Sequence, residues 1–133
     1  MATIYRSATL SVSPDAAWDV LDRYTRSELH IFKNCASERQ VDDYRVVVTL
    51  DGLELWERNI TVDPERRRAV YTVPGIPGTE HHQAEMRIDV DPDGRAVLVW
   101  TTDLLPQDLA HGMSDMYDVL FVDLVAAVEG RSA

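Results

Sequence analysis

Two adjacent histidines, His81 and His82, are the residues whose type and spacing first suggest chemistry. They begin a run of alternating residues, 81–90, that predicts a strand. Neighbours on a strand point to opposite faces, so the pair is badly placed to bind one metal ion, and we expect no metal site. His82 shares its parity with the apolar Ala84 and Met86. We expect His82 to reach a pocket, either as a neutral hydrogen-bonded side chain or as a ligand anchor or general acid/base.

A second candidate is the Glu57-Arg58 pair within the predicted strand 53–62, "LELWERNITV". Alternation leaves both faces of this strand mixed. One face would carry Trp56, Arg58, Ile60 and Val62, and the other Leu53, Leu55, Glu57 and Asn59. A charge that turns inward needs a partner, so we expect either Glu57 or Arg58 to hold a polar group of a ligand. The sequence leaves open which of the two faces inward.

Other candidates occupy neighbouring segments. Trp100 and Thr102 share one face of the strand predicted at 95–104, where Trp100 would form core or pocket wall and Thr102 could donate a hydrogen bond. Phe32 is expected to line or cover a pocket. Cys35 is the only cysteine, which excludes an intrachain disulfide and a Cys-x-x-Cys zinc site. We expect Cys35 to act as a small buried hydrophobe, and as a nucleophile only in principle.

The elements that position these residues follow from turn and cap signals. Ser13 and Pro14 predict the start of a helix over 13–24, and a short irregular or helical piece follows at 25–34. A first strand is predicted at 3–12, and the six strands predicted after residue 34 are separated by turns, among them Asp42-Asp43, Asp51-Gly52 and the "DPDG" of 91–94. Strands joined by hairpins form an antiparallel sheet, so the fold class is α+β.

A long helix is predicted from about residue 107 to 129. At about 100° per residue, one of its faces is apolar and its other face is polar. The apolar face carries Leu109, Met113, Met116, Leu120, Leu124 and Ala127, bordered by Tyr117 and Phe121. We expect this face to cover a curved sheet.

Length and charge restrict the function classes. The chain has 133 residues and 45% hydrophobic residues, which predicts one globular domain over 1–133. Its formal net charge of −10 argues against nucleic acid as a partner. No apolar run approaches the length of a membrane span, so we expect no membrane insertion and a cytoplasmic location.

Several stretches together resemble the START-like superfamily (SRPBCC, polyketide cyclase/dehydrase). They are "ATLSVSPDAAWDVLDRY", "LWERNITVDPERRRAVYTV", "PGIPGTEHHQAEMRIDVDPDGRAVLVWTTDL" and the last helix, and they cover almost the whole chain. The resemblance implies a helix-grip fold, in which a seven-stranded curved antiparallel sheet surrounds a long C-terminal helix, with two short helices between strands 1 and 2. It also implies a deep apolar cavity. In the family, the position of His82 is often aromatic and lines the cavity, and an acidic residue at the position of Glu57 commonly points inward.

Members of this superfamily bind or transform hydrophobic small molecules such as polyketides, lipids and sterols. We therefore expect an enzyme similar to polyketide cyclases, aromatases or dehydratases, with His82 and Glu57 moving protons and without a metal or organic cofactor. The expected ligand-binding residues are Arg58, Phe32, Trp56, Ala84, Met86, Trp100, Thr102, Met113, Met116, Tyr117 and Leu120. A non-catalytic carrier is the alternative, and a protein-interaction role is a third class. The chain would be a monomer or a homodimer.

Overall fold

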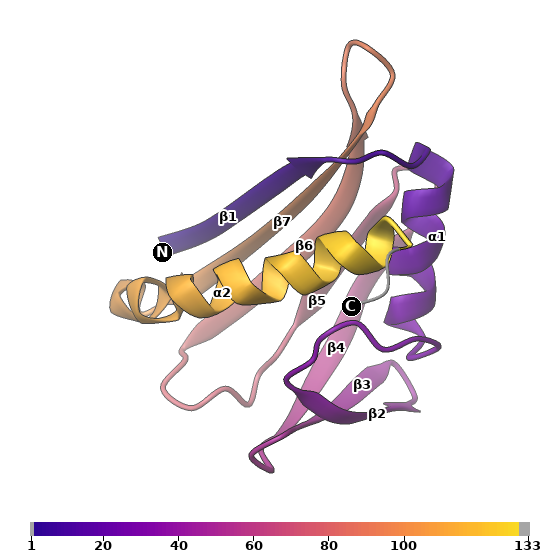
Figure 1. Ribbon diagram of the computed structural model, residues 1–133. Helices are drawn as coiled ribbons and strands as arrows, with labels where there is room; N and C mark the ends of the chain where they lie inside the picture. The colour runs from indigo at the N-terminus through magenta and orange to yellow at the C-terminus, as the bar shows by residue number, and fades with distance from the viewer. Residues whose placement is uncertain (1, 131–133) are drawn as a thin grey trace.

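Seven antiparallel strands form one curved sheet around a long C-terminal helix in the computed structural model, which describes residues 2–130 (Figure 1). The strands are β1 (Ala2–Thr9), β2 (Cys35–Val41), β3 (Tyr44–Thr49), β4 (Glu54–Asp63), β5 (Arg68–Thr72), β6 (His81–Val90) and β7 (Ala96–Leu105). Their order in the sheet is β1-β7-β6-β5-β4-β3-β2. From β2 to β7, each strand therefore pairs with its neighbour in sequence. The predicted α+β helix-grip architecture is confirmed.

The hairpin turns lie where the sequence predicts them. Asp42, with φ of 53°, joins β2 to β3, and Gly52, with φ of 91°, joins β3 to β4. Gly94, with φ of 82°, lies in the turn between β6 and β7. Positive φ is cheap for glycine and tolerated by aspartate, which explains these residue types. These turns set the register that brings specific side chains face to face across the sheet.

The first helix, α1 (Pro14–Thr25), begins as predicted, because the Ser13 hydroxyl accepts a hydrogen bond from the Ala16 N–H at 3.1 Å. The second short helix expected before β2 is absent, which corrects that prediction: residues 26–34 form turns and irregular backbone. The chain leaves the helical region at Ser27, whose φ is 57°. Further on, the backbone N–H of Lys33 donates to the buried carboxylate of Asp123 at 3.0 Å rather than to a helical carbonyl.

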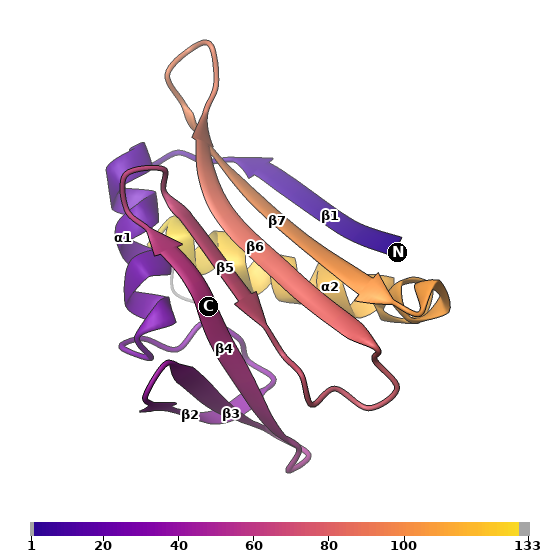
Figure 2. The same cartoon turned by 180° about the vertical axis from the view of Figure 1, so that it is seen from behind.

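The C-terminal helix, α2 (Gln107–Val128), lies across the concave side of the sheet but does not cover all of it (Figures 1 and 2). It packs against β1 and β7 and touches α1. Tyr117, Leu124 and Val128 are buried on its inner side, whereas Val119 and Val122 are each 66% exposed on its outer side. Because α2 packs on the β1–β7 side of the sheet, space remains over the strands toward β3.

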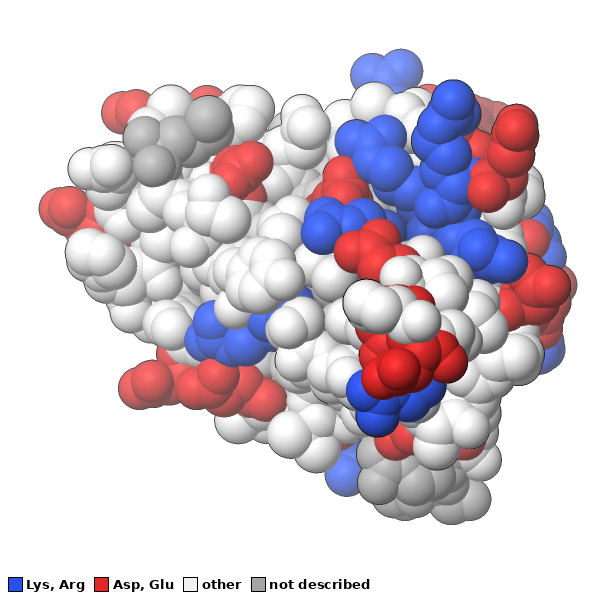
Figure 3. Space-filling model, turned by 90° about the horizontal axis from the view of Figure 1, so that it is seen from above, with Lys and Arg blue, Asp and Glu red and all other residues white. Residues whose placement is uncertain are grey.

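The charged surface consists largely of mixed pairs. Figure 3 shows Lys and Arg side chains gathered among Asp and Glu side chains on one face. Several arginines have acidic partners: Arg66 with Asp63, Arg67 with Asp15, Arg68 and Arg87 with Glu85, and Arg95 with Asp91. These arginines are therefore already neutralised locally. No helix within residues 2–130 is long and apolar enough to cross a membrane.

Candidate functional site

A cavity of about 440 Å³ lies between α2 and the concave side of the sheet. This volume is within the range typical of small-molecule sites. Its wall combines apolar side chains with a few polar ones, contributed by α1, the 26–34 segment, strands β2 to β7 and α2. The principal wall residues are Tyr24, Phe32, Arg45, Val47, Leu55, Glu57, Tyr71, Val73, His82, Trp100, Met113, Tyr117 and Leu120. The gap left by α2 is therefore a lined pocket.

Most of the predicted site residues do line this cavity. They are Glu57, His82, Phe32, Trp100, Met113, Met116, Tyr117 and Leu120. Two of the predicted residues do not line it. Trp56 and Arg58 lie on the outer face of β4, where the Arg58 side chain is 55% exposed and pairs with Asp43 at 3.1 Å. Three more predicted residues, Ala84, Met86 and Thr102, are buried in the sheet but do not belong to the wall of this cavity.

The inward direction of Glu57 is settled by the residue opposite it on β3. Arg45 faces Glu57 directly in the β3–β4 register. Cross-strand partners present their side chains on the same face of the sheet, so the two charges turn inward together. Arg58 therefore takes the outer face with Trp56. The question left open by the sequence is resolved in favour of Glu57.

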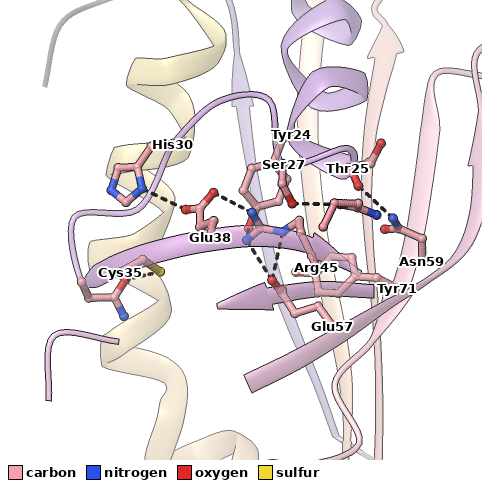
Figure 4. A network of polar contacts seen from close by, with 12 residues as sticks. Tyr24, Thr25, Ser27, His30, Cys35, Glu38, Arg45, Glu57, Asn59 and Tyr71 are labelled. Atoms are coloured by element: carbon pink, nitrogen blue, oxygen red, sulfur yellow. Dashed lines mark hydrogen bonds and ion pairs between the residues drawn. The ribbon is translucent and has the colours of Figure 1, made fainter. Parts of the chain in front are cut away.

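Arg45 is the centre of a buried ionic network, drawn in Figure 4. The residue is only 2% exposed. Its guanidinium donates to Glu57 Oε2 from Nε at 3.1 Å and from a terminal nitrogen at 2.8 Å, and to Glu38 Oε2 at 2.7 Å. It also donates to the Tyr24 hydroxyl and lies 3.8 Å above the centre of that ring. Such pairing allows a full charge to remain buried.

Glu57 uses only one of its two oxygens in this network. Both hydrogen bonds from Arg45 reach Oε2, and no donor among residues 2–130 is bonded to Oε1. The side chain lines the cavity and is 15% exposed. Burial raises the pKa of Glu57, and this effect exceeds the opposing effect of Arg45. A carboxylate with a raised pKa and a free oxygen is a better proton acceptor than an ordinary surface glutamate.

Two tyrosine hydroxyls offer hydrogen-bond donors to the same cavity. The Tyr71 hydroxyl accepts a hydrogen bond from the Trp100 indole at 3.1 Å, and the Tyr24 hydroxyl accepts one from Arg45. A phenol that accepts in this way still has its own hydrogen to donate. Burial raises the pKa of both tyrosines well above the usual range, so both remain protonated. They can therefore hold an oxygen of a ligand.

His82 faces the cavity, as its parity predicts, and is 6% exposed, whereas His81 is exposed. The backbone N–H of Val73 donates to His82 Nδ1 at 3.0 Å. Nδ1 is thus an acceptor, and the proton of the neutral ring is on Nε2. Burial lowers the pKa of His82 to about 4. At neutral pH, His82 is a fixed hydrogen-bond donor and a poor base.

The depressed pKa of His82 makes stability depend on pH. In the unfolded chain a histidine takes up a proton near pH 6.5, whereas folded His82 does so only near pH 4. The neutral His82 side chain therefore contributes roughly 3 kcal/mol to the free energy of unfolding. This contribution is complete above about pH 6.5 and is lost as the pH falls to about 4. Denaturant titrations of the wild type and His82→Asn at several pH values should show the wild type losing about this much more stability than the variant. Equal losses in the two proteins would refute the assignment.

Cys35 lies on the cavity wall but is unsuited to nucleophilic attack. Burial, with a smaller contribution from Glu38, raises the pKa of its thiol to about 11. Only the thiolate is reactive, and hardly any is present at neutral pH. Within residues 2–130, no three His, Cys, Asp or Glu side chains lie close enough together to hold a metal ion.

Sequence reasoning missed much of the polar end of the site. The wall residues that were not predicted as site residues are Tyr24, Asn34, Arg45, Val47, Thr49, Leu50, Asp51, Leu53, Leu55, Tyr71, Val73 and Ile76. Glu38, buried behind Arg45, was missed as well, and its Oε1 lies 2.9 Å from Nδ1 of the half-exposed His30. One signal was available: Arg45 interrupts an otherwise apolar strand, and a charge placed there needs a buried partner.

Comparison with known structures identifies the fold. The protein XoxI from Bacillus cereus superposes with a TM-score of 0.80 at 14% identity, over 98% of this chain and 94% of that one. A point mutant of norcoclaurine synthase from Thalictrum flavum, in complex with a transition-state analogue, gives 0.71 at 14% identity over 96% and 93% of the two chains. The ZhuI aromatase/cyclase from a Streptomyces species gives 0.70 at 23% identity over 97% and 92%.

The chain has the START-like helix-grip fold. No protein-family model matches the sequence, and no curated protein matches it. At these sequence identities, the similarity to the solved structures shows the fold and not the function. The chemistry of the cavity therefore depends on the side chains that line it.

Proposed function

We propose that the chain binds a hydrophobic, carbonyl-bearing small molecule in the cavity and acts on it as a metal-free acid/base enzyme of the cyclase, aromatase or dehydratase kind. The observation that carries this proposal is the free Oε1 of Glu57, a carboxylate with raised pKa at the polar end of an otherwise largely apolar pocket. The two fold neighbours named as a norcoclaurine synthase and an aromatase/cyclase are compatible with such chemistry.

The side chains divide into a base, its holder and a set of donors. Glu57 accepts a proton from a carbon next to a carbonyl group, and Arg45 fixes its orientation through Oε2. Tyr24, Tyr71 and His82 Nε2–H are the candidates to donate hydrogen bonds to the oxygen that gains negative charge. The proton held by Glu57 can then pass to that oxygen or to a leaving hydroxyl. His82 thus has a donor role in place of the base role expected from the sequence.

Occupancy of the cavity can be tested by blocking it. Leu120 lines the cavity, and its neighbour Val119 points outward from the same helix. Leu120→Trp should weaken binding of the neutral dye Nile red at least about tenfold, because the indole fills space that the dye needs. Val119→Trp is the matched control and should bind as the wild type does. The measurement is a fluorescence titration of each protein.

Equal dye affinities of Leu120→Trp and the wild type would show that the dye binds elsewhere and would overturn the cavity as the binding site. Circular dichroism and thermal unfolding of both variants show that the comparison is made between folded proteins. Loss of binding in Val119→Trp as well would point instead to the exposed face of α2.

A further inference from the structure

The charged groups around the cavity have a net negative sum. Three charged residues belong to its wall: Arg45, Glu57 and Asp51, the last near the opening in the β3–β4 turn. Glu38 adds a second buried carboxylate behind Arg45. Hydrogen bonding by Thr49 lowers the pKa of Asp51, which keeps it ionised. Glu38 also contacts the half-exposed His30.

Among residues 2–130, Arg45 is the only Lys or Arg on the wall, and most of its donors already have partners. Arg45 donates to Glu57, Glu38 and Tyr24 from all three of its nitrogens. Four of its five N–H groups are used in these bonds, so a ligand carboxylate would find only one N–H and would meet the free Oε1 of Glu57 in a poorly solvated space. His82 offers no positive charge at neutral pH, since burial lowers its pKa to about 4. An anionic ligand head is therefore opposed at the polar end of the cavity.

The remaining wall is favourable to a cation. Tyr24, Phe32, Trp100 and Tyr117 form a chain of ring contacts, with centroids 5.8, 5.7 and 4.8 Å apart in that order. Tyr71 joins this chain through its hydrogen bond with Trp100. Faces of aromatic rings attract ammonium groups, and a carboxylate beside them adds direct attraction. These five rings line the same pocket as the free Oε1 of Glu57.

We infer that this cavity selects hydrophobic amines over hydrophobic carboxylates, with the protonated amine bound at Glu57 Oε1 and the apolar body against the aromatic wall. Neutral molecules of the same shape bind with intermediate affinity, since they lack both the attraction and the repulsion. The inference rests on the binding part of the proposed function, that a hydrophobic molecule occupies the cavity. It does not require Glu57 to act as a base, because a protonated amine at Oε1 occupies the oxygen that would accept the proton. It names the charge class of the molecule that the site accepts.

Three probes that share one apolar body test this selection: naphthylethylamine, naphthylethanol and naphthylacetate. Isothermal titration at neutral pH and physiological salt should rank the amine first, the alcohol second and the carboxylate last. We expect at least about a tenfold difference in dissociation constant between amine and carboxylate. The Leu120→Trp protein should lose this binding, which excludes attraction to the acidic surface as its cause.

The variant that tests the anchor is Glu57→Gln. It should reduce the amine-to-carboxylate ratio to within about threefold. Glu65→Gln, in the exposed β4–β5 turn, changes the net charge equally and should leave the ratio as in the wild type. The order of the three probes on the wild type needs no variant, so the inference stays testable if Glu57→Gln fails to fold.

The outcomes separate the inference from the proposed function. If the alcohol binds in the cavity and the carboxylate binds as tightly as the amine, the charge selection is overturned while binding of hydrophobic molecules stands. If none of the three probes and no Nile red binds, the proposed function fails and the inference fails with it.

Discussion

Replacing Arg45 with methionine is expected to lower the free energy of unfolding by about 3–5 kcal/mol at neutral pH. The change leaves two buried carboxylates, Glu38 and Glu57, without the cation that both contact. Burial already raises the pKa of Glu57, and loss of Arg45 raises it further, so protonation of Glu57 relieves part of the penalty. The deficit relative to the wild type should therefore shrink as the pH falls. Urea unfolding followed by circular dichroism at several pH values measures it.

Arg58→Met is the matched control, because Arg58 is an exposed arginine on the adjoining strand with a single carboxylate partner. It should change the unfolding free energy by less than about 1 kcal/mol. A cost for Arg45→Met no larger than the cost for Arg58→Met would contradict the buried network as described.

Glu57→Gln is expected to lower kcat by about 10²- to 10⁴-fold on any compound that the wild type converts. Glutamine keeps the shape and one acceptor for Arg45 but cannot take up a proton. Binding of neutral Nile red should change by no more than about threefold, since the apolar wall is unaltered. Steady-state kinetics and dye titration on the same protein preparation separate the two effects.

Glu54→Gln supplies the control for this experiment, because Glu54 lies on the same strand but is directed to the outer face beside Trp56. Its kcat should equal that of the wild type. Full turnover by Glu57→Gln would remove Glu57 as the base. Tight ligand binding without turnover by the wild type itself would favour a carrier.

Alternation along a strand predicted the buried face correctly where one face is consistently apolar. On β6, His82 shares a face with Ala84, Met86 and Ile88, and the structure buries all four. On β4 the same argument gave no answer, because each face mixes apolar and charged residues. The structure places Trp56 and Ile60 on the outer face despite their hydrophobicity. They alternate with Glu57, which lies on the inner face together with its cross-strand partner Arg45. The direction of the β4 side chains therefore depends on partners on another strand and not on the sequence of β4 alone.

The fold was more predictable than the polar end of the cavity. Hairpin turns, the Ser13 cap and the apolar stripe of the last helix depend on residues close in sequence. The network of Tyr24, Glu38, Arg45 and Glu57 joins α1 with three strands, so it depends on the tertiary register. The prediction of a second short helix was wrong for a related reason. The N–H of Lys33 donates its hydrogen bond to Asp123, which is 90 residues away. Local patterns do not contain such partners.

Native mass spectrometry of the protein purified without denaturation tests the central claim most directly. We expect the wild type to carry one hydrophobic small molecule per chain, and we expect this adduct to be missing from Leu120→Trp and present in Val119→Trp. The mass of the released compound can then be measured. Its charge class shows whether it is an amine, as the free carboxylate oxygen of Glu57 leads us to expect. Two results would show that the cavity does not bind a hydrophobic small molecule. One is an adduct retained equally by Leu120→Trp, and the other is a wild type that carries no adduct and binds no apolar probe.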